Sequence, residues 1–314
     1  MARLAFSRHG VGSPLVLLHG LGSTRAAWDP VIPVLAGHFD VLAVDLPGFG
    51  NSEPVPPHAE PDPAFLAAAV ADLLDELGIE RPHVVGNSLG GWVALELAHV
   101  RPVASLTLLS PAGLWRGGTP LYCRASLRAS RWLSQHAAGT LSRLVNHRLG
   151  RILVLGQTHG RPSRMSPEQA RAAILAVRIA SGFDDTLTAT ATRHYVSGPA
   201  LDAPVTVAFG SRDRLLLPHQ SRHLDELPPG TQYATLPGCG HLPMTDDPPA
   251  VAALVTASTV RGESGEGRTA WSAADRTPPG GSGLPTRNTP CCSTHQDLNS
   301  RSGATSISSR RGCP

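Results

Sequence analysis

The chain has 314 residues with 27 basic and 24 acidic side chains, and every basic residue is an arginine. No apolar run reaches the ~18 residues of a membrane helix, and no long apolar segment near the start predicts a signal peptide. The five cysteines lack the spacing of a disulfide framework or a zinc site, so we expect a cytoplasmic protein without a bound metal. Nothing in the composition indicates a cofactor or a nucleic-acid partner.

The N-terminal third alternates short apolar runs with helical segments. Strands are expected at residues 4–6, 15–18, 41–44, 84–86 and 106–109, and helices at 63–77 and 89–99. This alternation is typical of βαβ units, so it predicts an α/β fold whose mostly parallel central sheet is flanked by helices.

The sequence Gly-Asn-Ser-Leu-Gly-Gly at residues 86–91 separates an expected strand from an expected helix. A G-x-S-x-G motif in this setting is a nucleophile elbow, in which small neighbours allow a sharp turn that exposes the serine hydroxyl. Ser88 is therefore the candidate nucleophile. Leu89 lies in the first helical turn, where backbone N–H groups lack partners within the helix and can bind an oxyanion.

Residues 115–200 interrupt the alternation with helices expected at 121–136, 141–155 and 167–181. This segment holds 12 arginines but only three acidic residues. The arginines either form solvated helix faces or attract an anionic substrate or a membrane surface. Apolar residues recur at roughly helical spacing and are expected to line a pocket or to pack on the core: Trp115, Leu121, Leu127 and Trp132.

A serine nucleophile needs a base and a carboxylate that orients the base. The candidate base is His241 and the candidate carboxylate is Asp213, because each follows a segment that reads as a strand running into a glycine-containing loop. Both would then lie at the carboxyl edge of the sheet, where ligands bind in open α/β sheets. No carboxylate follows the expected strand at 106–109, which leaves Asp213 as the leading candidate.

The last expected helix, 250–259, ends where the composition changes. Residues 261–314 are rich in Ser, Gly, Thr, Pro and Arg and poor in apolar side chains, so they are expected to be disordered. The expected organisation is a core formed by residues 1–114 and 201–260, a helical cap at 115–200 and this tail.

These motifs together resemble those of α/β-hydrolase-fold enzymes. The resemblance rests on the elbow, on Leu-His-Gly-Leu-Gly at 18–22, on Asp-Leu-Pro-Gly-Phe-Gly-Asn-Ser at 45–52, and on the chain order Ser, Asp, His. It implies an α/β-hydrolase fold with a helical cap over the active site, and an oxyanion hole formed by the backbone N–H groups of Leu21 and Leu89. A serine at the elbow argues against the dehalogenases and epoxide hydrolases of this fold, which use an aspartate.

Polar residues near the motifs have structural interpretations. His19 is expected to form hydrogen bonds beside the oxyanion loop, and Asp45 to hold its glycine-rich loop. Asp246 and Asp247 are expected to accept hydrogen bonds at the start of the final helix, which the Pro-Pro pair at 248–249 would open.

The resemblance and the candidate residues predict a serine hydrolase that cleaves an ester-type bond of a small acyl substrate through an acyl-enzyme. Carbon–carbon bond hydrolysis, lactone opening, acyl transfer and cofactor-free perhydrolysis are alternatives within the fold. The form of the elbow and the basic cap, which would suit an anionic substrate, weakly favour the first of these. A non-catalytic ligand-binding protein is the alternative of another class, and the complete set of Ser, Asp and His disfavours it.

Overall fold

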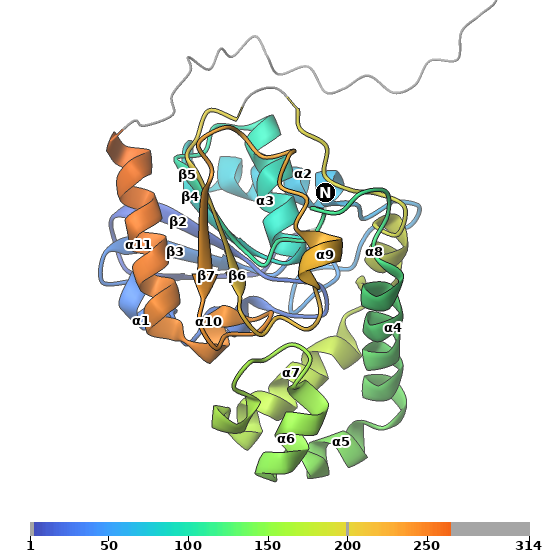
Figure 1. Ribbon diagram of the computed structural model, residues 1–314. Coiled ribbons are helices and arrows are strands. Elements are labelled where there is room, and N and C mark those ends of the chain that lie inside the picture. Colours follow the sequence, from blue (N-terminus) through green and yellow to red (C-terminus); the bar gives the residue numbers. More distant parts are fainter. Residues whose placement is uncertain (1–2, 199–200, 265–314) are drawn as a thin grey trace, which may run out of the picture. The chain divides into compact units, whose positions relative to one another are not determined.

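A seven-stranded sheet forms the centre of the computed structural model, which describes residues 3–198 and 201–264 (Figure 1). The strands have the order β1-β3-β2-β4-β5-β6-β7, and among them only β1 runs antiparallel to its neighbour. This confirms the mostly parallel sheet. The strands are β1 Phe6–His9, β2 Ser13–Leu18, β3 Phe39–Val44, β4 His83–Asn87, β5 Ser105–Leu109, β6 Val205–Gly210 and β7 Gln232–Leu236.

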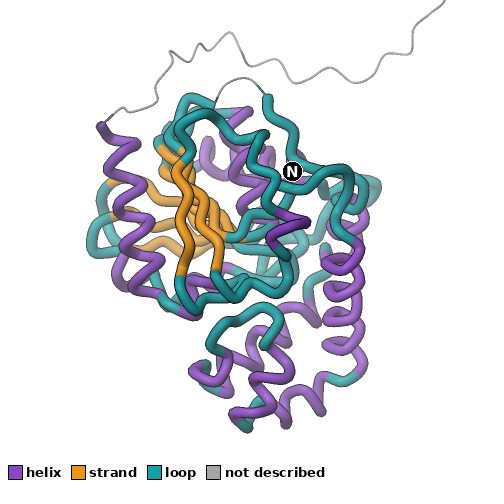
Figure 2. The backbone as a smooth tube through the Cα atoms, viewed as in Figure 1, coloured by secondary structure: helices purple, strands orange, loops and turns teal. Residues whose placement is uncertain are grey.

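Alternating apolar side chains give the sheet two buried faces. In β2, Leu15 and Leu17 pack into one hydrophobic layer, whereas Val16 and Leu18 pack into the other. One face is covered by α2 (Pro63–Glu76) and α3 (Leu89–Val100), and the other by α1 (Ile32–Leu35), α10 (Pro243–Asp246) and α11 (Pro248–Ser264). Figure 2 shows the strands between these helical layers. Three short helices lie in the loops between other elements: η1 Arg25–Trp28, η2 Pro162–Arg164 and α9 Pro218–Ser221.

Five α-helices and η2 connect β5 to β6, and we call residues 115–198 the cap. The α-helices are α4 Leu121–His136, α5 Ala138–Leu144, α6 Arg148–Leu155, α7 Pro167–Ile179 and α8 Phe183–Ala189. The single helix expected at 141–155 is wrong, because α5 ends before α6 begins. A Cβ on Gly150 would lie 1.8 Å from the Leu144 carbonyl oxygen, so the absent side chain lets α6 turn back tightly against α5.

The final helix is longer than the sequence predicted. α11 extends to Ser264, so the first four residues of the expected tail are helical. The disorder expected for the rest of the tail concerns residues 265–314, which lie outside the described part of the chain. All described residues belong to the first of two units, residues 1–276.

Candidate active site

Ser88 stands at a sharp turn between β4 and α3. Its backbone has φ +54° and ψ −117°, a conformation that costs a non-glycine residue about 1–3 kcal/mol. Neighbouring glycines permit the turn: a Cβ on Gly86 would lie 2.2 Å from the Gly90 carbonyl oxygen. The turn leaves the Ser88 side chain partly exposed in a cavity while the flanking strand and helix stay buried.

Asp213 and His241 form a buried pair after β6 and β7. The His241 Nδ1 atom lies 2.9 Å from Asp213 Oδ2. Asp213 Oδ1 also accepts hydrogen bonds from the N–H groups of Leu215 and Leu216, at 3.0 and 2.9 Å. Burial alone would raise the pKa of Asp213, but the His241 ring and the two amides outweigh it and hold this pKa below its ordinary value. An ionised Asp213 favours the His241 tautomer that carries its proton on Nδ1, which leaves Nε2 free to accept one.

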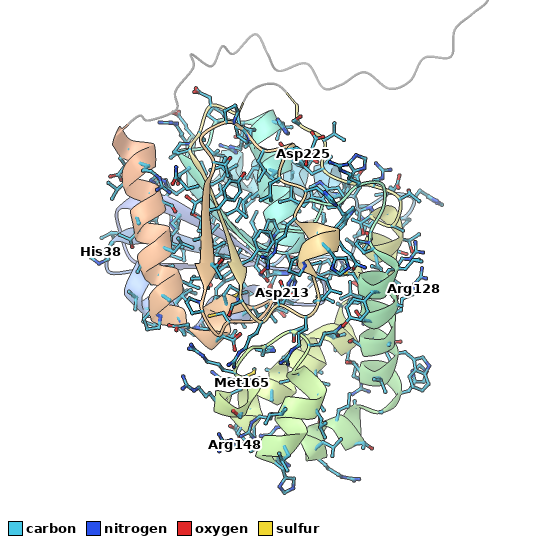
Figure 3. The ribbon with its side chains drawn as sticks, viewed as in Figure 1. His38, Arg128, Arg148, Met165, Asp213 and Asp225 are labelled. Carbon is cyan, nitrogen blue, oxygen red and sulfur yellow. The ribbon has the colours of Figure 1, made fainter. Side chains whose placement is uncertain are left out.

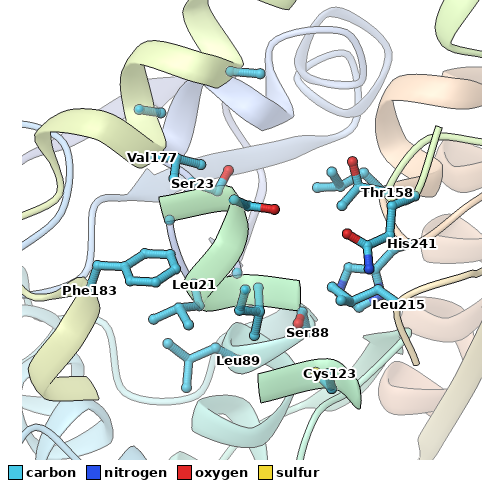
Figure 4. Close-up of a pocket in the computed structure, with 18 of the residues that line it drawn as sticks. Leu21, Ser23, Ser88, Leu89, Cys123, Thr158, Val177, Phe183, Leu215 and His241 are labelled. Carbon is cyan, nitrogen blue, oxygen red and sulfur yellow. The ribbon is translucent and has the colours of Figure 1, made fainter. Parts of the chain in front are cut away.

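The three candidate catalytic residues meet at one cavity of about 360 Å³. Ser88 and His241 both line it (Figure 4), and Asp213 contacts His241 from behind. The sequence therefore located three side chains that the fold brings together from segments up to 153 positions apart.

The two backbone N–H groups expected to form an oxyanion hole lie beside Ser88. Leu21 and Leu89 both line the cavity. The loop that carries Leu21 approaches the elbow closely, since a Cβ on Gly20 would lie 3.1 Å from Ser88 Cβ. Within residues 3–198 and 201–264, neither N–H has a hydrogen-bond partner. Both are thus available to a bound oxygen atom.

His19 and Asp45 support the loops around this site. The buried His19 ring bonds Gly20 O through Nδ1 at 2.8 Å and accepts from Leu46 N–H through Nε2 at 3.0 Å. Asp45 accepts from the backbone N–H of Arg25 at 2.7 Å and of Asn51 at 3.0 Å, and it pairs with the Arg25 guanidinium. Both residues have the supporting contacts that the sequence predicted.

Sequence reasoning missed the role of Asn87. Its buried Nδ2 group donates to the carbonyl oxygens of Leu109 and His241, at 3.0 and 2.9 Å. Asn87 thus ties the elbow directly to the backbone of the candidate base. The sequence did carry a signal for this role. Asn87 directly follows the strand expected at 84–86, and a buried amide needs hydrogen-bond partners.

The expectation for Asp246 is wrong. Only Asp247 accepts a hydrogen bond at the start of α11, from Ala250 N–H at 3.3 Å. Asp246 turns away and accepts from the backbone N–H groups of Gly240 and Gly160, each at 2.7 Å, and of Arg161 at 2.8 Å. These donors come from the His241 loop and from the cap. Three hydrogen bonds to its oxygens stabilise a buried carboxylate more than the single bond available at the start of α11 would.

The cavity wall is mostly apolar, with neutral Ser, Thr, Asn and Gln side chains and two histidines among its polar groups. Among the described residues that line it, none is Arg, Asp or Glu. Trp115 and Leu127 contribute to the wall as predicted, whereas Leu121 and Trp132 are exposed and do not. Two cap arginines bind away from the cavity: Arg131 contacts Asp184 and backbone carbonyls of α7, and Arg161 contacts Asp247.

Two further cavity-lining side chains carry reactive atoms. Burial, assisted by the charge of Asp213, raises the pKa of the Cys123 thiol to about 12, so this cysteine remains protonated. Burial lowers the pKa of His159, whose Nδ1 lies 2.9 Å from Thr158 Oγ1. His159 is therefore a neutral imidazole in the cavity wall near neutral pH.

No group of three metal-binding side chains occurs among the described residues, and no helix described there could span a membrane.

Comparison with known proteins places this site in a family. Residues 15–254 match the profile of the Alpha/beta hydrolase family. An uncharacterised protein of Mycobacterium tuberculosis is 31% identical over 264 residues, which cover 78% of this chain and 75% of that protein. A pimeloyl-[acyl-carrier protein] methyl ester esterase of Aeromonas hydrophila is 42% identical over 109 residues, which cover 35% of this chain and 41% of the esterase.

A solved structure extends the comparison to the whole fold. The thermophilic esterase from Thermogutta terrifontis superimposes with a TM-score of 0.67 over 83% of this chain and 94% of the esterase chain. At 23% identity this likeness concerns the fold. The family profile, the mycobacterial relative and the shared architecture agree, and the chain belongs to the alpha/beta hydrolase family as a hydrolase of this fold.

Proposed function

We propose that the protein is a carboxylic ester hydrolase that transfers a neutral, apolar acyl group first to Ser88 and then to water. One observation carries the proposal: a serine at a strained elbow, a histidine held by a buried aspartate, and two backbone N–H groups without a partner among the described residues all border the same mostly apolar cavity. The aspartate itself lies behind the histidine. Acyl transfer through a serine requires this set of groups.

Acylation begins with proton transfer from Ser88 to His241. The Ser88 Oγ atom attacks the ester carbonyl carbon while its proton moves to His241 Nε2. The carbonyl oxygen gains negative charge, which the N–H groups of Leu21 and Leu89 stabilise. When the intermediate collapses, the bond to the alcohol oxygen breaks and His241 gives its proton to that oxygen.

Deacylation repeats the sequence with water. A water molecule adds to the acyl carbon and gives a proton to His241, which then returns a proton to Ser88 Oγ as the carboxylic acid leaves. Throughout, Asp213 remains ionised and stabilises the positive charge that His241 acquires. Its lowered pKa supports this role near neutral pH.

The uncharged cavity wall favours an apolar acyl group over an anionic one. A carboxylate bound inside would be desolvated without a cationic partner, which is costly. This disfavours carbon–carbon hydrolysis of acidic substrates, although the cap is rich in arginine. The relative named a pimeloyl-[acyl-carrier protein] methyl ester esterase also supports cleavage of an ester.

A series of p-nitrophenyl esters from acetate to decanoate tests the proposal. We expect turnover of the esters, and a loss of about 10⁴-fold or more in Ser88→Ala protein that folds normally. A fluorophosphonate probe should label the native protein and spare the variant. Equal labelling of both proteins, or turnover of a vinylogous diketo acid in place of every ester, would overturn the proposal.

A further inference from the structure

The outer face of α6 is apolar, which is unusual for a surface helix. Leu149, Ile152 and Leu153 follow the i, i+3, i+4 spacing of one helix face and are 74%, 42% and 81% exposed. The opposite face buries Gly150, Arg151 and Leu155. The helix thus turns Arg151 inward and three large apolar side chains outward, the reverse of the usual arrangement.

The cavity that holds Ser88 reaches the surface at this face. Leu153 lines the cavity although most of its side chain is exposed. Leu133 of α4 also lines the cavity and is 41% exposed. Two exposed leucines therefore border the opening into a mostly apolar interior. With the other exposed apolar side chains of α5 and α6 they form what we call the mouth cluster: Leu133, Leu144, Leu149, Ile152 and Leu153.

The surrounding cap carries uncompensated positive charge. Two of its three acids are paired within it, Glu168 with Arg171 and Asp184 with Arg131. Apart from the buried Arg151, which donates to backbone carbonyls, six cap arginines have no ion pair within the described part of the chain: Arg124, Arg128, Arg143, Arg148, Arg164 and Arg178. Figure 3 shows Arg128 on α4 and Arg148 on α6, so the charge spans both helices that border the mouth.

We propose that the mouth cluster and these arginines form a surface that docks on an anionic phospholipid bilayer. Exposed leucine and isoleucine side chains gain free energy by entering the headgroup–acyl boundary, and guanidinium groups bind lipid phosphates. A second copy of the chain fits this face less well, because two such surfaces would bring like charges together.

Docking would place the mouth where lipid acyl chains are available. A lipid ester could then move from the bilayer into the cavity without exposing its chain to water. This assignment of the substrate class rests on the proposed ester hydrolase function. The docking surface itself does not, because none of its residues takes part in the chemistry at Ser88.

Vesicle sedimentation of Ser88→Ala protein tests docking without turnover. We expect binding to vesicles of phosphatidylcholine with phosphatidylglycerol, weak binding to phosphatidylcholine alone, and a decrease with salt. Leu149→Ser/Ile152→Ser should weaken binding by at least about tenfold, whereas the matched control Val11→Ser/Val100→Ser, exposed on the core, should not. Arg143→Gln/Arg148→Gln should cost about 25-fold, roughly fivefold for each arginine.

Three results would overturn the docking surface: no vesicle binding, equal binding to both vesicle types, or equal losses in the control. A dimer that dissociates in Leu149→Ser/Ile152→Ser protein without any vesicle binding would assign the face to a second copy instead. Ester turnover by the wild-type protein is measured separately. Docking without turnover therefore contradicts only the proposed function, and turnover without docking contradicts only the surface.

Discussion

The carboxylate of Asp246 accepts a hydrogen bond of 2.7 Å from the N–H group of Gly240, the residue directly before His241. The same carboxylate binds the N–H groups of Gly160 and Arg161 in the cap. One buried side chain therefore joins the loop of the candidate base to the segment that closes the cavity above it. Leu242 N–H, bonded to Thr158 O at 3.1 Å, adds a second link between the same two segments.

Asp246→Asn is expected to lower the free energy of unfolding by about 2–3 kcal/mol. An asparagine places an NH₂ group where the structure needs an acceptor for three backbone donors, so at least one donor loses its partner. The His241 loop should also lose its fixed position, which would lower kcat for a short ester more than it changes KM. Urea unfolding and steady-state kinetics of the purified variant measure both effects.

The neighbouring Asp247→Asn provides the matched control. Asp247 binds Arg161 at 2.9 Å and Ala250 N–H at 3.3 Å from a position that is partly exposed. Its replacement should cost about 1 kcal/mol or less and leave kcat unchanged. Similar losses of kcat in the two variants would show that Asp246 does not position the His241 loop.

The sequence was sufficient to predict the parts of the site that local motifs determine. Ser88 lies in an elbow whose small residues are contiguous, and Asp213 and His241 each follow an apolar run that becomes a strand. Parallel strands place such positions at one edge of the sheet, so their convergence followed from topology. Their roles in catalysis stay predictions until activity is measured.

Contacts between distant segments could not be predicted in this way. Asn87 reaches the backbone of His241 across 154 positions, and Asp246 reaches Gly160 across 86. Neither partner is a side chain, so no residue type marks it. Helical spacing also could not decide whether Leu121 and Trp132 are exposed or buried. The spacing shows which residues share a face of α4, but it does not show which face meets the solvent.

Asn87→Asp is expected to be severely destabilising, by about 3 kcal/mol or more. The substitution keeps the shape but replaces a donor of two hydrogen bonds with acceptor oxygens that face two carbonyl groups. It also buries a negative charge without a cationic partner. Thermal unfolding measures the effect, and the exposed Asn51→Asp is the control, expected to change stability by about 0.5 kcal/mol or less. If both variants unfold alike, the amide of Asn87 has no structural role.

Ala176→Phe should shorten the acyl chain that the cavity accepts. Ala176 of α7 lines the cavity, and a phenyl ring there would fill space that a long chain needs. We expect kcat/KM to fall about 10–100-fold for an octanoate ester and to change less than about threefold for acetate. Ala172→Phe, exposed on the same helix, should change neither value. A uniform loss for all chain lengths would instead indicate damage to the elbow or to the His241 loop.

Stability should decrease as the pH falls from about 7 to 5. Burial lowers the pKa of His19 and of His159 below the ordinary value of 6.5. Below pH 6.5 the unfolded chain therefore binds protons that the folded protein excludes, so the free energy of unfolding rises with pH in this window. Each histidine contributes at most about 1.4 kcal/mol per pH unit.

Urea unfolding at several pH values should show a smaller dependence of the free energy of unfolding on pH for His159→Gln than for the wild-type protein. The exposed His147→Gln is the control, and a slope that is the same in all three proteins would mean that His159 protonates as readily in the folded protein as in the unfolded chain.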